Sequence, residues 1–105
     1  MKKIIACFLI APSIASAHFM SGNDLLRDMN GGSVNRGLAL GYVLGVTDAL
    51  YSIVVCPPTN ITAGQLTDII RKHLEDNPGS RHYSADSIIA NKLASIWPCQ
   101  KGKGV

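Results

Sequence analysis

Few side chains in this 105-residue sequence are of the types that catalyse reactions or bind metal ions. His73 and His82 could share a metal ion, but no third ligand stands near them, and catalytic zinc sites use three protein ligands. The motifs G-x-S-x-G, H-E-x-x-H and C-x-x-C are absent, and Gly31-Gly32 alone is a turn rather than a phosphate-binding loop. We therefore expect no catalytic residue, no metal and no cofactor, and we predict that the protein is not an enzyme.

The N-terminus has the order of regions that is typical of a secretory signal peptide. Lys2 and Lys3 form a basic start, residues 4–11 form an apolar run, and Ala15-Ser16-Ala17 is a small-x-small cleavage site. The apolar run is shorter than the roughly 20 residues that span a bilayer. We predict that residues 1–17 are a signal peptide cleaved after Ala17, and that residues 18–105 form a single periplasmic domain. The alternative is a buried N-terminal helix.

Loss of this segment would remove Cys7 and leave two cysteines, Cys56 and Cys99. An even number of cysteines in an exported chain favours a disulfide. Metal ligation and a catalytic thiol are the alternatives, and neither cysteine has the nearby histidine or carboxylate partners that a metal site needs. A bridge that closes a loop of about 40 residues stabilises a fold by about 4 kcal/mol in the loop-entropy model, before any native strain is subtracted.

Composition excludes several classes of protein. The sequence is 47% hydrophobic and 16% charged, which argues against intrinsic disorder. Its formal net charge is +3, and Lys2 and Lys3 supply two of those charges, so the predicted mature chain is nearly neutral. A nearly neutral chain lacks the basic face that nucleic-acid binders present, and it gives no reason to expect binding to a membrane surface after signal removal.

The elements that would position these residues are predicted to be four helices, so the expected fold class is all-α, a small bundle with one disulfide. Ser21 and Asp24, and later Thr62 and Gln65, have the spacing of capping boxes at helix N-termini. Ser84 is expected to cap the last helix. Apolar residues recur at helical spacing behind each of these caps, and prolines end the second and fourth helices.

Residues 37–55 are predicted to form the central helix, and Asp48 is their one charged residue. A transmembrane segment is the alternative, which the polar residues and glycines disfavour. Small residues recur every four positions at Gly37, Gly41, Gly45 and Ala49. Such a ridge would let another helix approach closely, within one chain or across a homodimer. We expect Asp48 to bond to a loop backbone or to the end of a neighbouring helix.

A polar segment, Arg81-His82-Tyr83, separates the last two predicted helices. It is either a solvated loop with Tyr83 packed on the following helix, or a recognition surface, because loops on rigid helices often carry binding residues. The candidate surface extends from this loop onto the exposed side of the preceding helix. Its candidate partner-binding residues are Arg71, Lys72, Glu75, Asn77, Arg81, His82 and Tyr83.

Several short stretches, taken in order, resemble the Rap/Tai family of type VI secretion amidase immunity proteins. They cover most of residues 21–99 and are Gly41-Tyr42-Val43, Gly45-Val46, Asp48-Ala49, Cys56-Pro57-Pro58, Thr62 with Gln65, Leu74 with Asn77-Pro78, His82 with Ser84-Ala85, and Trp97-Pro98-Cys99. The resemblance implies a periplasmic helical protein, often a homodimer, that binds and inhibits an amidase effector which would otherwise cut peptidoglycan peptides.

Cys56 and Cys99 match the disulfide pair of that family. Many relatives carry a second pair, near Met29 and near Ala39, which this sequence lacks. Two alternatives to an immunity function remain at this point. One is a small periplasmic chaperone that resembles HdeA and loosens at acid pH, and the other is an envelope structural protein without an inhibitory role.

Overall fold

The structure is a computed structural model, and it describes residues 19–100. These residues form four α-helices, α1 (Gly22–Met29), α2 (Ser33–Leu50), α3 (Ala63–Asp76) and α4 (Ala85–Ile96), with a short 3-10 turn, η3 (Pro78–Ser80), between the last two. No strand is found between residues 19 and 100, where pairing is limited to isolated bridges. The predicted all-α class is therefore confirmed. The predicted signal peptide lies outside the described residues.

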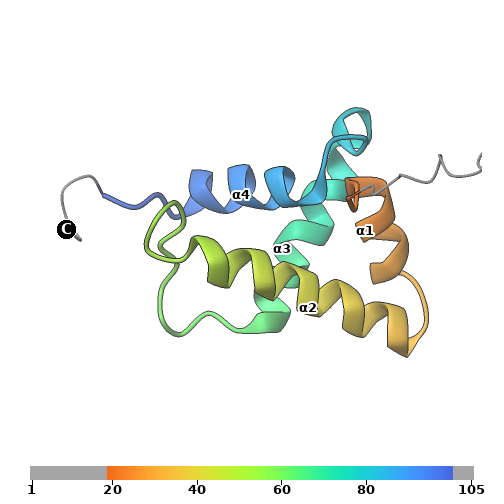
Figure 1. Ribbon diagram of the computed structural model, residues 1–105, viewed down its shortest axis with the longest axis horizontal. Helices are drawn as coiled ribbons and strands as arrows, with labels where there is room; N and C mark the ends of the chain where they lie inside the picture. Colours follow the sequence, from red (N-terminus) through yellow and green to blue (C-terminus); the bar gives the residue numbers. More distant parts are fainter. Residues whose placement is uncertain (1–18, 101–105) are drawn as a thin grey trace, which may run out of the picture.

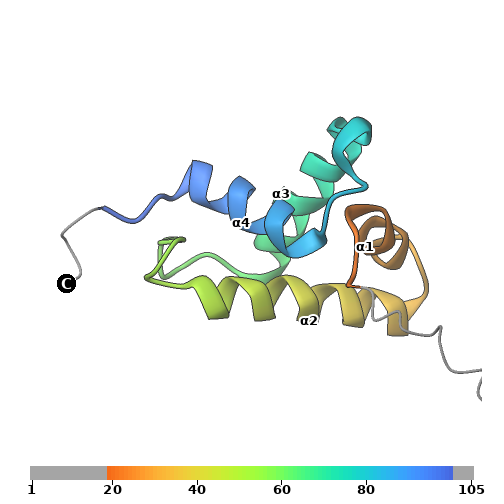
Figure 2. The same cartoon turned by 45° about the horizontal axis from the view of Figure 1, so that its top comes forward.

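The four helices form a bundle in which every pair is in contact. The long axes of α2 and α4 run along the molecule, α3 crosses behind them, and α1 packs across the N-terminal half of α2 (Figures 1 and 2). The core between them is apolar and consists of Leu25, Met29, Ala39, Val43, Val55, Leu66, Ile70, Leu74, Ala85, Ile88, Ile89 and Leu93. Met29 and Ala39 are both buried members of this core.

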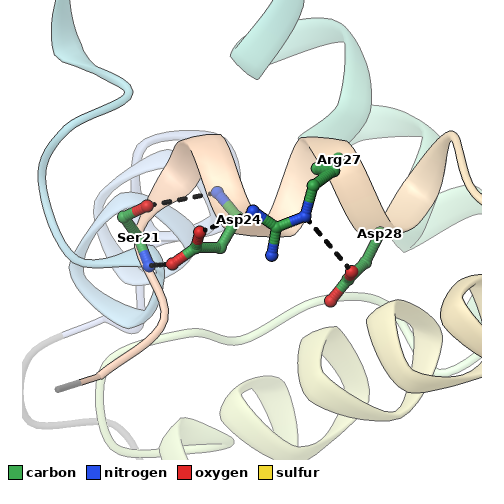
Figure 3. Close-up of polar contacts among 4 residues, drawn as sticks. All are labelled: Ser21, Asp24, Arg27 and Asp28. Carbon is green, nitrogen blue, oxygen red and sulfur yellow. Dashed lines mark hydrogen bonds and ion pairs between the residues drawn. The ribbon is translucent and has the colours of Figure 1, made fainter.

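Side chains cap the start of α1 and α3 as the spacing predicts. The Ser21 hydroxyl accepts a hydrogen bond from the Asp24 amide, and the Asp24 carboxylate accepts one from the Ser21 amide (Figure 3). The latter bond lowers the pKa of Asp24, and Arg27 pairs with the same carboxylate at 3.0 Å. Thr62 and Gln65 form an equivalent capping box on α3. These caps satisfy amides that a helix leaves unpaired at its N-terminus.

The N-cap of α4 lacks the side-chain hydrogen bond that was expected of it. Ser84 does occupy the N-cap position, but its side chain makes no capping hydrogen bond to the helix backbone. Its hydroxyl lies 2.6 Å from that of Ser87 instead. The backbone is held from outside the helix, because the Ala85 amide donates to the Met20 carbonyl at 2.8 Å.

The bounds predicted for the central helix are wrong at both ends. Helix α2 begins at Ser33 and ends at Leu50, so residues 51–55 form a turn in place of a helical end. The amides of Ile53, Val54 and Val55 all donate to the Leu50 carbonyl, and Ser52 has a φ of 66°. This turn buries Val55 in the core, an arrangement that local helical propensity does not reveal.

The predicted disulfide joins Cys56 to Cys99, with 5.0 Å between their Cα atoms. It follows directly on the turn of residues 51–55 and lies just beyond the end of α4. The Cys56 amide also donates to the Trp97 carbonyl at 2.8 Å, so a backbone bond and the bridge hold the same two segments together. The prediction of a Cys56–Cys99 bridge is confirmed.

The ridge of small residues faces away from the core, so its expected packing within the chain is wrong. Gly37, Gly41, Gly45 and Ala49 are all exposed. The buried stripe of α2 is Ala39, Val43 and Thr47. At about 100° per residue, a two-residue offset places the two stripes on nearly opposite sides of the helix. The side chains of Ala39, Val43 and Thr47 bury surface in the core that glycine could not supply. Packing of the ridge across a homodimer stays a prediction.

Asp48 does not make the hydrogen bond that was expected of it among the described residues. Its carboxylate is exposed and receives no hydrogen bond or ion pair from residues 19–100, so it is not held by a loop backbone or a helix end.

Over residues 19–100, no helix combines the length and apolar character of a membrane span.

Candidate functional site

A groove lies between α3 and α4 and continues toward the predicted recognition loop. Its first hollow has a volume of about 510 Å³ and takes Lys72, His73 and Asn77 from α3 and Lys92 and Ile96 from α4. Ile69 and Ile96 give it apolar surface, while Asp68 and Asp76 balance the two lysines. Lys72 is paired with Asp76 at 3.0 Å. The hollow is thus apolar with a mixed-charge rim.

A second hollow continues this groove toward η3. It has a volume of about 380 Å³ and is lined by His73, Ser80, Tyr83, Ser84, Ser87, Ile88 and Asn91. His73 lines both hollows, so its imidazole marks the point where they meet. The second hollow carries hydroxyl and amide groups where the first carries charges. The combined surface therefore offers both hydrogen-bonding and ionic contacts.

His73 is held in its neutral form by its surroundings. Burial lowers the pKa of its imidazole, the positive charge of Lys92 lowers it further, and Asp76 opposes these effects. The Asn77 side-chain amide lies 3.3 Å from Nδ1 of His73 and also donates to its backbone carbonyl at 2.8 Å. An amide N–H can donate to Nδ1 only when that nitrogen carries no proton, so this contact favours the neutral ring as well.

The loop next to this groove exposes two stacked rings. The ring centroids of His82 and Tyr83 are 4.1 Å apart at an interplanar angle of 35°. Both residues are exposed, and Tyr83 retains 56% of its accessible surface. Tyr83 lines the second hollow beside residues of α4 and still leaves more than half of its surface exposed. A large exposed ring on a fixed loop is well suited to anchor a protein partner.

The backbone under these rings is tied to the start of α1. The amides of Gly22 and Asn23 donate to the carbonyls of Tyr83 and Arg81, at 3.0 and 2.8 Å. Gly22 permits this approach, because a Cβ there would lie 2.9 Å from the Arg81 carbonyl oxygen and 2.7 Å from Cδ1 of Ile88. The loop is thus a rigid platform rather than a free segment.

A sequence model of the Rap1a immunity proteins matches residues 21–99. The chain belongs to this family. The match spans all four helices and ends at Cys99, so the disulfide, the groove and the exposed rings lie within the matched region. No curated protein matches the chain at a significant level. Membership in the Rap1a family gives the chain an immunity function, which entails binding to a cognate effector.

Within this Rap1a domain, the predicted partner-binding residues do not all share one surface. Lys72 and Asn77 line the first hollow, Tyr83 lines the second, and His82 stacks on Tyr83. Glu75 is exposed on α3. These five residues stay the candidate contacts of a partner.

The two predicted arginines have contacts inside the chain. Arg71 donates to the Asn30 side-chain oxygen at 2.7 Å and to the Met29 carbonyl at 3.3 Å, which joins α3 to the end of α1. Arg81 is half-buried, and its Nε atom is buried without a hydrogen-bond partner in the described part of the chain. Their positions make them supports of the surface more than contacts on it.

The side of the groove that α4 supplies was not among the residues predicted from the sequence. Ser84, Ser87 and Asn91 are spaced three and four residues apart and share one polar side of the helix. Such a polar stripe in the sequence can indicate a binding surface, but it is equally typical of a helix side that faces solvent. In the stretch that the structure describes, no group of three or more His, Cys, Asp or Glu side chains is placed to hold a metal ion.

Proposed function

We propose that this protein is a periplasmic immunity protein that binds and inhibits a peptidoglycan amidase delivered by type VI secretion. The observation that carries the proposal is the family match over residues 21–99. The amidase target comes from the resemblance to amidase immunity proteins. The basic, apolar and small-residue regions of the N-terminus and the Cys56–Cys99 disulfide support an oxidising, extracytoplasmic location.

The effector is proposed to bind on the groove between α3 and α4 and on the adjoining His82–Tyr83 pair. A concave apolar groove with a polar rim, beside exposed aromatic rings, has the composition of protein-binding surfaces. The backbone of the loop is already tied to α1, so binding would order few additional residues. A preorganised surface loses less conformational entropy on association and binds more tightly for the same contact area.

The exposed side of α2 is proposed to form a homodimer contact. Val34 and Leu38 retain 75% and 59% of their accessible surface there. Gly37, Gly41 and Gly45 lie on the same exposed side, and a Cβ at any of these three positions would meet no atom within 4 Å. A second α2 could therefore approach closely and cover the two apolar side chains.

Co-expression tests the function. The full chain is produced together with a periplasmic amidase that carries a catalytic cysteine and histidine, encoded next to it, and lysis is compared with and without the chain. We expect protection from lysis and a complex between the purified proteins at micromolar concentration or below. Equal lysis with no complex would contradict the immunity function and leave the chaperone or structural alternatives. N-terminal sequencing of the periplasmic protein should begin at His18.

Variants test the surface. Tyr83→Ala and His82→Ala should weaken the complex at least tenfold, because truncation of a hot-spot anchor costs about 2 kcal/mol or more and about 1.4 kcal/mol is tenfold in affinity. Arg36→Ala serves as the control, since Arg36 is exposed near the start of α2 and its side chain bonds only to the Gly31 carbonyl among the described residues. Equal affinity of all three variants would place the effector on another surface.

A further inference from the structure

A separate hollow opens between the C-terminal half of α2 and residues 57–63, on a part of the molecule that the proposed effector groove does not use. Its volume is about 360 Å³. The segment that leads to α3 curves past the C-terminal end of α2 (Figure 1). Its residues Pro57, Pro58, Thr59 and Ile61 line one side of the hollow. Most of the lining is apolar, with Leu44, Pro57, Pro58 and Ile61 among its residues.

Asp48 is the one charged residue that lines this hollow. Its carboxylate has no cation within 4 Å and no hydrogen-bond donor among residues 19–100. The nearby Thr47 hydroxyl does not serve it, because that hydroxyl donates to the Val43 carbonyl at 2.7 Å. The hollow therefore combines apolar walls with a single unmatched negative charge.

Tyr51 supplies an aromatic ring to the same hollow. It is half exposed and lies at the first position of the turn that follows α2. That turn is fixed by three amides that donate to the Leu50 carbonyl and by a bond from the Ser52 amide to the Val55 carbonyl. Val55 is fully buried, and Cys56 is bridged to Cys99. The backbone of Tyr51 thus leads into a fixed turn, and Tyr51 and Asp48 line the same hollow.

We propose that this hollow receives an arginine side chain from a protein partner. A guanidinium pairs with a carboxylate through two parallel hydrogen bonds and stacks on an aromatic ring, and its methylene stem packs on apolar walls. Asp48, Tyr51 and the surrounding aliphatic and proline side chains supply these three features. A neutral or anionic group in the same place would leave the carboxylate desolvated and unpaired, which is unfavourable. The partner is taken to be the effector, which would reach this hollow in addition to the groove; that identification rests on the proposed function, whereas the recognition of arginine does not.

A small probe tests the recognition directly. The isotope-labelled protein, recovered after expression of the full chain, is titrated with N-acetyl-arginine methylamide and followed by amide chemical shifts. N-acetyl-citrulline methylamide, which has nearly the same shape and no charge, is the matched probe. We expect saturable shifts that centre on Asp48, Tyr51 and Ile61, with a dissociation constant at least fivefold weaker for the citrulline probe.

Variants complete the test. Asp48→Asn keeps the shape and removes the charge, and Tyr51→Leu removes the ring, so each should weaken arginine binding at least threefold. Asp86→Asn removes an exposed carboxylate at the start of α4 that lines neither this hollow nor the proposed effector groove, and it should leave arginine binding unchanged. No saturable shift, equal binding of both probes, or shifts centred elsewhere would overturn the proposal.

The same variants separate this proposal from the immunity function. If the wild-type protein protects against the amidase while the arginine probe fails to bind, the hollow is not an arginine site and the immunity function stands. If the probe binds and Asp48→Asn loses it, but no amidase is bound, the arginine site stands and the effector assignment fails.

Discussion

The side-chain amide of Asn77 lies 3.3 Å from Nδ1 of His73 and 2.8 Å from the carbonyl oxygen of the same residue. One amide therefore satisfies a carbonyl at the C-terminal end of α3 and faces the imidazole that joins the two hollows of the groove. The contact to Nδ1 exists only with the neutral ring. The cap of a helix and the protonation state of a groove residue are thus coupled through one side chain.

This coupling predicts a loss of stability at mildly acidic pH. Burial and Lys92 lower the pKa of His73 in the folded protein, whereas the unfolded chain titrates near the ordinary value of about 6.5. As the pH falls through about 6.5, the unfolded chain binds a proton at this histidine before the folded protein does. The contribution of His73 to the free energy of unfolding is therefore complete above that pH and is lost progressively below it. The free energy of unfolding, measured with denaturant, should fall less between pH 7.5 and pH 5.5 for His73→Gln than for the wild type.

Substitution of Asn77 tests the cause of the same effect. Asn77→Asp replaces the donor by a carboxylate beside the ring, which should raise the pKa of His73 in an imidazole NMR titration. Asn77→Ala should cost about 1 kcal/mol, because the His73 carbonyl loses its side-chain hydrogen bond. An unchanged titration midpoint in Asn77→Asp would show that the contact does not govern the protonation of His73.

Gly22 is expected to be the least replaceable glycine of the described region. Gly22→Ala should destabilise the fold by about 1–3 kcal/mol, since the added methyl would press on the Arg81 carbonyl and on Ile88. Gly64→Ala is the control, because its nearest neighbour beyond the helix is the Thr62 hydroxyl at 4.0 Å. Denaturant unfolding compares the two, and equal stabilities would mean that the α1 platform tolerates the methyl group.

Gly41→Leu should leave the fold intact and abolish the homodimer. A side chain at this position enters open space in a single chain but would keep a second α2 at a distance. Light scattering after size-exclusion chromatography gives the mass, and circular dichroism reports the fold. A variant that unfolds, or a wild type that is monomeric at all concentrations, would contradict the proposed contact.

The disulfide is expected to supply a large part of the stability. Cys99→Ser should lose about 4 kcal/mol and lower the melting temperature markedly, because the bridge closes a loop with a sequence separation of 43 residues. Thiol titration of the native protein should find no free cysteine among the two bridged positions. Unchanged melting after reduction or substitution would show that the backbone bond between Cys56 and Trp97 holds these segments without the bridge.

The sequence alone determined the features that depend on neighbouring residues. The capping boxes at Ser21 and Thr62 require only a three-residue spacing, and the apolar stripes of α3 and α4 follow from helical periodicity. Because the predicted signal peptide holds Cys7, the sequence leaves Cys56 and Cys99 one partner each, which predicts their disulfide. These features were predicted correctly because the interactions behind them are local or involve only one available partner.

Only the tertiary structure decided the orientation of α2 and the shape of the binding surfaces. Helix α2 is apolar on most sides, so periodicity does not say that Val43 is buried and Gly41 is exposed. The turn at Ser52 forms because Val55 packs in the core, and the groove exists because α4 brings Lys92 and Asn91 next to His73. Each depends on contacts between segments far apart in the chain, whose free energy is set by the area that packing buries and not by any local pattern.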